Sequence, residues 1–139
     1  MSEENVEIVR RLYDAVAARD SDTVLSIYHP QLEWDHSHNT EMAGLIGQKL
    51  YRGHEGLRRW AREFYEAWDT VEAELEEVID AGDDLVVAVL NYRGRGRVSG
   101  IEVEFTRMAG VFTIRDGQVV RAEWYRDRRP ALEAAGLSE

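Results

Sequence analysis

The feature that most constrains the fold of this chain is a change of hydrophobic period near residue 70. Before that point, apolar residues recur every three or four positions, as on one face of a helix. The strongest stripe of this kind consists of Leu57, Trp60, Ala61, Phe64 and Trp68. After that point, strand-like patterns fill residues 70–81, 85–96, 100–114 and 118–126. This order predicts an α+β fold, with helices packed on one side of a curved sheet.

Local signals place the other elements of the predicted fold. Residues 3–19 have a helical pattern, and residues 21–28 form a short second helix that Asp20 can cap. A strand opens after that helix, and residues 38–53 follow as a long loop of a kind that often carries function. Residues 85–96 are apolar on both faces, which predicts a central strand that is covered on two sides.

The composition fits one folded domain spanning residues 1–139. Lys and Arg number 17 against 27 Asp and Glu, which gives a net charge of −10. Because such a chain repels phosphate backbones and anionic lipids, we expect neither nucleic acid nor a membrane as a partner. The alternating Arg93, Arg95 and Arg97 are interpreted as solvated residues of a hairpin tip.

The chain has no cysteine, which excludes disulfides, thiolate catalysis and cysteine-ligated metals. We also expect no cofactor. No apolar run approaches the length that spans a bilayer, and the N-terminal "MSEENVEIVRR" lacks the apolar centre of a signal peptide. A cytoplasmic location is therefore the default expectation.

The stretch "LEWDHSHNT" holds the most suggestive polar residues of the chain. On a regular strand, side chains alternate, so Trp34, His36 and His38 share one face while Asp35 lies on the other. Trp34 is apolar, so its face should point inward and carry His36 into the interior. His36 could then be a hydrogen-bonded wall residue, an acid or base, or a metal ligand. Asp35 should point away from the interior unless a bulge intervenes.

A metal site would need more than the His36 and His38 pair. A catalytic zinc requires a third ligand, and His54 or Glu41 could supply it only if the loop folds back. Because no further ligand motif accompanies the pair, we predict no metal site.

Several stretches resemble the SnoaL-like branch of the nuclear transport factor 2-like superfamily, which includes ketosteroid isomerase. They are "VRRLYDAVAARDSDTVLSIYHPQLEWD", "YRGHEGLRRWAREFYEAW", "GVFTIRDGQVVRAEWYRD" and "ALEAAGL", and together they cover nearly the whole chain. The resemblance implies a cone-shaped roll, in which a strongly curved mixed or antiparallel sheet and N-terminal helices enclose an apolar pocket. It also implies a homodimer. Because this fold hosts many functions, the reaction does not follow from it.

The isomerase machinery does not carry over to this chain. That enzyme uses a strand aspartate as base, with a tyrosine and a protonated aspartate binding the oxyanion. The base position falls on His36, or on Asp35 after a one-residue slip, while the tyrosine position falls on Leu12, beside Tyr13. The second aspartate position falls on Arg107. None of the three positions matches outright, so we do not expect steroid isomerisation by these groups.

A different catalytic pair remains after this comparison. His36 could act as the base, and Arg107 could stabilise an enolate or hold a carboxylate, with Asp35 or Asn91 assisting. Arg107 could instead be a strand arginine that pairs across the sheet with a glutamate such as Glu104.

The pocket itself is expected to be aromatic. The candidate lining residues are Tyr13, Tyr28, Trp34, His38, Trp60, Phe64, Asn91 and Trp124. Aromatic residues at helical spacing also fill cores, so each could be core instead. The leading hypothesis is a protein that binds or converts an apolar small molecule by proton transfer, as an isomerase or cyclase would. The alternatives are a binding protein without catalysis and a dimerisation scaffold.

Overall fold

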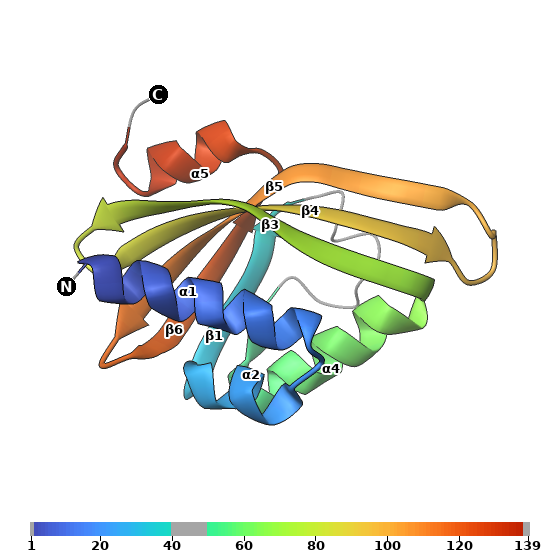
Figure 1. Ribbon diagram of the computed structural model, residues 1–139, viewed down its shortest axis with the longest axis horizontal. Coiled ribbons are helices and arrows are strands. Elements are labelled where there is room, and N and C mark those ends of the chain that lie inside the picture. The colour runs from blue at the N-terminus through green and yellow to red at the C-terminus, as the bar shows by residue number, and fades with distance from the viewer. Residues whose placement is uncertain (1, 40–49, 138–139) are drawn as a thin grey trace.

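A computed structural model describes residues 2–39 and 50–137 (Figure 1). The helices are α1 (Ser2–Ala17), α2 (Ser21–Ile27), α4 (Gly53–Glu66) and α5 (Arg128–Ala134). The strands are β1 (Tyr28–His38), β2 (Leu50–Arg52), β3 (Trp68–Gly82), β4 (Leu85–Gly96), β5 (Glu102–Arg115) and β6 (Gln118–Tyr125). No helix in this part of the chain is long and apolar enough to cross a bilayer.

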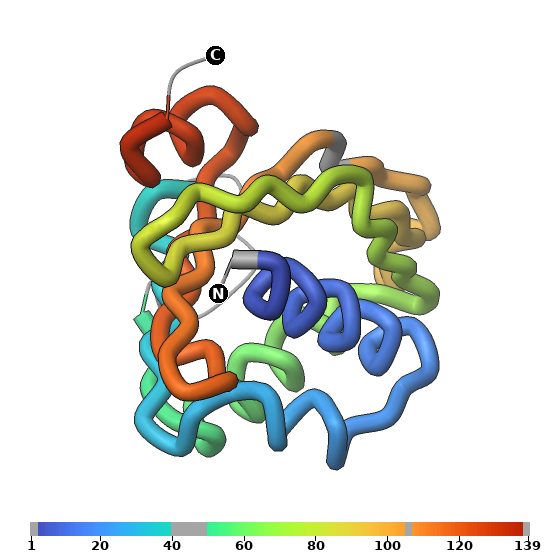
Figure 2. Tube along the Cα trace, turned by 60° about the vertical axis from the view of Figure 1, so that its left-hand side comes forward, coloured from blue at the N-terminus to red at the C-terminus, as the bar shows by residue number. Residues whose placement is uncertain are grey.

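The strands form one mixed sheet in the order β2-β1-β6-β5-β4-β3. Strands β3 to β6 follow one another as an antiparallel meander, as expected, whereas β1 pairs with β6 in parallel. The sheet wraps around α1, so that β3 and β4 pass over this helix while β6 and β1 stand beside it (Figure 2). The predicted α+β class and curved mixed sheet are confirmed.

Two hydrophobic clusters lie on opposite faces of the sheet. The larger one fills the concave face and includes Leu12, Trp34, Phe64, Leu90 and Trp124. The smaller one lies between the convex face and α5, where Val87 and Val89 meet Leu132. In Figure 1, α5 accordingly lies across the sheet from α1. Strand β4 is therefore covered on both sides, which confirms the interpretation of its continuous apolar run.

Local chemistry fixes the entry of the helices beneath the sheet. The Asp20 side chain accepts hydrogen bonds from the Thr23 amide at 3.2 Å and the Thr23 hydroxyl at 2.6 Å, which caps α2 as predicted. Helix α4 begins at Gly53, whose φ of 67° favours glycine and where an added Cβ would lie 2.9 Å from the Pro30 carbonyl oxygen. Residues 50–52 form β2 rather than the predicted loop, and residues 40–49 lie outside the described part of the chain.

The sheet has several register shifts, and two of them affect residues of the predicted site. Between Asp35 and His38, β1 advances three residues while β6 advances only two, from Glu123 to Tyr125. Between Met108 and Phe105, β5 advances three residues while β4 advances two, and Arg107 has a φ of 57° there. Beyond each bulge, every side chain moves to the face opposite to the one that simple counting predicts.

Candidate functional site

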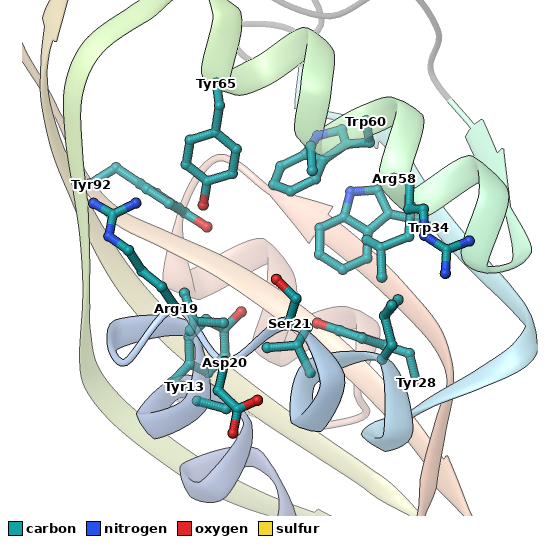
Figure 3. A pocket seen from close by; sticks show the side chains of 16 residues that line it. Tyr13, Arg19, Asp20, Ser21, Tyr28, Trp34, Arg58, Trp60, Tyr65 and Tyr92 are labelled. Carbon is teal, nitrogen blue, oxygen red and sulfur yellow. The ribbon is translucent and has the colours of Figure 1, made fainter.

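A cavity of about 450 Å³ lies between the helices and the concave face of the sheet (Figure 3). Its wall is largely aromatic, with side chains from α1, β1, α4 and β4: Tyr13, Tyr28, Trp34, Trp60, Tyr65 and Tyr92. Aliphatic groups such as Val24, Leu57 and Ala61 complete it, and Arg19, Asp20, Ser21 and Arg58 contribute polar groups. The volume and the lining are those of a small-molecule site. Of the predicted lining residues, Tyr13, Tyr28, Trp34 and Trp60 take part in the cavity.

The tyrosine hydroxyls are the main polar groups inside this cavity. Within the described residues, the hydroxyls of Tyr13, Tyr28, Tyr65 and Tyr92 form no hydrogen bond. Burial raises the pKa of each of the four, so every hydroxyl keeps its proton at neutral pH. The cavity therefore offers neutral hydrogen-bond donors that await an acceptor, such as a carbonyl oxygen.

His36 lies in the core behind this wall and is not among the lining residues. Its Nε2 accepts a hydrogen bond of 2.8 Å from the Trp34 indole, and its ring stacks between Trp60 and Trp124 at centroid distances of 5.8 and 6.0 Å. Nδ1, which must carry the proton of this tautomer, has no hydrogen-bond partner among the described residues. Burial lowers the pKa of His36 to about 3, against the opposing effect of Asp35. His36 is therefore neutral and covered on both ring faces.

Phe64 and Trp124 also belong to the core rather than to the cavity wall. Phe64 is fully buried and stacks on Trp60 at 5.2 Å. Trp124 is buried against Phe112, and Gly110 makes room for it, because a Cβ at that glycine would lie 2.8 Å from the Trp124 ring. The prediction that Phe64 and Trp124 line the pocket is wrong, since Trp60 and Trp34 stand in front of them.

Arg107 and Asn91 lie on the convex face of the sheet and not in the cavity, where they were predicted to act. The Arg107 side chain is 54% exposed and pairs with Glu76 at 3.5 Å, while its backbone amide donates to the Asn91 side-chain oxygen at 2.8 Å. The β5 bulge explains this placement, because Asn91 stands opposite the inserted residue and satisfies its amide. The expectation that Arg107 faces His36 across the pocket is therefore wrong, as is the placement of Asn91 in the pocket.

Asp35 and His38 lie together on the convex face, on the far side of β1 from Trp34. The β1 bulge carries His38 to this face, where its ring stacks on Tyr125 at 4.7 Å. The outward orientation predicted for Asp35 is confirmed, whereas the prediction that His38 shares the inner face with His36 is wrong. A histidine metal pair is therefore impossible, since the two rings lie on opposite sides of the sheet.

Arg121 organises the carboxylates of this convex cluster. Its guanidinium contacts Glu33, Asp35 at 3.1 Å and Glu123 at 3.0 Å. Burial disfavours the charge of Asp35, but a hydrogen bond from Ser37 and the charge of Arg121 outweigh it and lower the pKa of Asp35. Burial together with Glu123 raises the pKa of Tyr125 to about 12.

The same cluster contains the one group of potential metal ligands found in the described part of the chain. Ligand atoms of Asp35, His38 and Glu123 all lie within 4.8 Å of one another. Arg121 already donates to both carboxylates, and Tyr125 donates to Glu123 at 3.2 Å, so protein donors occupy oxygens that a cation would need. His54 is engaged elsewhere, with its Nε2 2.7 Å from the Tyr28 carbonyl oxygen, and Glu41 lies outside the described residues.

The sequence analysis missed most of the residues that line the cavity, and the polar ones that matter most below are Arg19, Tyr65 and Tyr92. Tyr92 continues the alternation of Val86, Ala88 and Leu90, but the neighbouring face of β4 is equally apolar, so the pattern alone favoured neither. Tyr65 directly follows the apolar stripe of α4 at Phe64. Arg19 carried no sequence signal, because it was counted simply as the last residue of a helix.

Comparisons with known proteins agree with this architecture. The profile of the SnoaL-like domain matches residues 9–122. An NTF2-like protein of Burkholderia thailandensis is 30% identical, with 87% of this chain and 88% of that chain covered and a TM-score of 0.74. No curated protein matches the chain.

Two further solved structures, both below 25% identity, support the fold alone. TerC, co-crystallised with polyporic acid, is 23% identical over 96% of this chain and 98% of its own, with a TM-score of 0.74. A candidate SnoaL-like polyketide cyclase of Jannaschia sp. CCS1 is 23% identical over 90% and 86%, with a TM-score of 0.69. Because the matching profile spans most of the sequence, the chain belongs to the SnoaL-like family, within the NTF2-like, ketosteroid isomerase-like fold group.

Proposed function

We propose that this chain binds an apolar, ring-containing small molecule in the cavity between its helices and its sheet. The observation that carries the proposal is the aromatic wall of this cavity of about 450 Å³, in which four tyrosine hydroxyls form no hydrogen bond with the described residues. Flat aromatic walls favour stacking with a ring system. Hydroxyls that face the cavity and have no partner among the described residues are able to donate to a ligand that carries hydrogen-bond acceptors.

The relatives make such a ligand reasonable for this fold. TerC was co-crystallised with polyporic acid, and the Jannaschia protein is named as a candidate polyketide cyclase. Both names point to small molecules as the ligands of related proteins. Neither name identifies the ligand of the present chain, whose identity with both proteins is 23%.

Binding is supported better than conversion by proton transfer. Among the described lining residues, the one carboxylate is Asp20, which is engaged in capping α2. His36 stands behind Trp34 and Trp60, and with a pKa of about 3 its imidazole is a weak base at neutral pH. The tyrosines could polarise a carbonyl group, but the described wall supplies no base to remove the neighbouring proton.

Filling the cavity tests this proposal. Anthraquinone-2-carboxamide is a suitable neutral probe, because it combines fused rings with carbonyl acceptors. Its binding can be measured by titration calorimetry with the unmodified chain, with Ala61→Phe in the cavity wall, and with Ala134→Phe on the exposed face of α5 as the matched control. We expect Ala61→Phe to abolish binding while Ala134→Phe keeps it. Equal binding by both variants, with folding verified by circular dichroism, would place the ligand elsewhere and refute the proposal.

A further inference from the structure

Charge is unevenly distributed around the cavity. Arg19 and Arg58 line it, and neither guanidinium forms an ion pair with a carboxylate of the described residues. Several other arginines of this acidic chain are paired, as Arg52 with Glu33, Arg93 with Glu104 and Arg121 with three acids. The Asp20 carboxylate in the wall is held by Thr23 instead. The cavity therefore keeps positive charge that the protein itself does not neutralise.

Arg19 has an unusual backbone for its residue type. Its φ of 58° lies in the left-handed region, directly after the last turn of α1, where its amide bonds to the Val16 carbonyl at 3.1 Å. Helices commonly end with a glycine in this conformation, because other residues are strained there. An arginine at this position does not relieve the strain of the left-handed backbone. Its side chain, which reaches the cavity, offers the better reason for its presence.

Tyr65 and Tyr92 stand on the same side of the cavity as Arg19. In Figure 3 their hydroxyls point toward one another, with the Arg19 side chain next to them and Arg58 on the opposite side. Burial raises the pKa of both tyrosines. The positive charge of Arg19 lowers the pKa of Tyr65, and Tyr65 adds to the rise in the pKa of Tyr92, which agrees with this proximity. Three donors therefore lie together at one side of an aromatic cavity, and none of them is occupied by a carboxylate of the described residues.

We propose that this cavity selects aromatic anions, with the ionised oxygen of the ligand bound by Arg19 and the hydroxyls of Tyr65 and Tyr92. The inference rests on the proposed binding function and adds the chemical class of the ligand. A guanidinium holds a carboxylate or an enolate through a planar fork of donors, and hydrogen bonds to a charged acceptor are stronger than those to a neutral one. The ring system of the ligand would extend toward Trp34 and Trp60.

A matched pair of probes tests the inference. Anthraquinone-2-carboxylate and anthraquinone-2-carboxamide differ in charge and hardly in shape, and calorimetry gives the dissociation constant of each. We expect the carboxylate to bind roughly fivefold to tenfold more tightly at low salt, a modest preference because the arginine is partly exposed to solvent. Added salt should weaken the binding of the carboxylate probe and leave that of the amide probe unchanged. Equal affinities would overturn the inference and leave the binding function standing, whereas failure of both probes would refute the binding function itself.

Variants then assign the preference to Arg19. Arg19→Gln should reduce the ratio of the two affinities to about one. Arg62→Gln, on an α4 residue outside the cavity wall, is the matched control and should keep the ratio. Tyr65→Phe keeps the charge of the cavity and should weaken the binding of the carboxylate probe more than that of the amide probe. An unchanged ratio in Arg19→Gln, or an equal loss in Arg19→Gln and Arg62→Gln, would refute the role of Arg19.

Discussion

His36 should make the folded protein sensitive to acid. In the unfolded chain its imidazole takes up a proton as the pH falls below about 6.5, whereas in the folded protein it does so only near a pKa of about 3. Between these values the unfolded state holds one more proton than the folded state, so acidification favours unfolding. Each pH unit in this interval removes about 1.4 kcal/mol of the free energy of unfolding. The whole interval removes roughly 5 kcal/mol, which is comparable to the stability of a small domain.

The effect can be isolated by comparing pH dependences. His36→Gln removes the titrating group and retains an oxygen that can accept from the Trp34 indole. Urea unfolding at pH 7 and pH 4.5 gives the loss of stability for each protein, and carboxylates contribute to both losses alike. We expect unmodified protein to lose about 3 kcal/mol more than His36→Gln, because about two units of this pH range lie below the unfolded-state pKa of about 6.5. His29→Gln, at an exposed hydrogen-bonding position, serves as the histidine control.

A single result would refute this account of His36. If His36→Gln and unmodified protein lose equal stability between pH 7 and pH 4.5, the imidazole is already able to accept a proton in the folded state. A direct measurement comes from the ring C–H resonances of His36, which should not titrate between pH 4 and pH 8. Titration near neutral pH would restore His36 as a candidate base and would favour conversion over simple binding.

Four further predictions concern stability and assembly. Gly110→Ala should lower the free energy of unfolding by roughly 1–3 kcal/mol in urea titrations, because its Cβ would lie 2.8 Å from the Trp124 ring. Arg121→Met should cost roughly 1–3 kcal/mol, since three carboxylates lose their shared partner, whereas Arg115→Met should cost little. Arg19→Gly should raise the free energy of unfolding in urea titrations by about 0.5–1 kcal/mol, because glycine adopts the left-handed backbone of this position without strain. The homodimer expected from the family remains a prediction, which sedimentation equilibrium can test.

The sequence was sufficient to predict the fold because the periodic signals were long and local. The stripe from Leu57 to Phe64 corresponds to α4, although Trp68, which was counted with this stripe, is the first residue of β3. The four strand patterns after residue 70 correspond to β3 through β6. The apolar residues of each pattern lie on one side of the element, so the pattern can be recognised without knowledge of the neighbouring elements. The parallel pairing of β1 with β6 was not encoded in this way, since it depends on how distant segments pack.

The site was harder to predict because residue counting assumes unbroken strands. Both bulges lie next to residues on which the predicted chemistry depended: His38 follows one, and Arg107 sits in the other. A single inserted residue moves a side chain across the sheet without changing the local composition. The predicted pair of His36 and Arg107 was therefore divided between the core and the convex surface.

Strand β4 gives the clearest reason why polarity was a poor guide to the cavity. Asn91 attracted attention as the polar residue of an apolar face, yet its amide serves the backbone of the β5 bulge. Tyr92 looked like an ordinary strand aromatic, yet its hydroxyl is one of the four that form no hydrogen bond with the described residues. A polar side chain in a sheet satisfies the nearest unpaired backbone group first. The groups left for a ligand are those whose neighbours are already satisfied, and here they are tyrosines, whose apolar rings allow them to be mistaken for core.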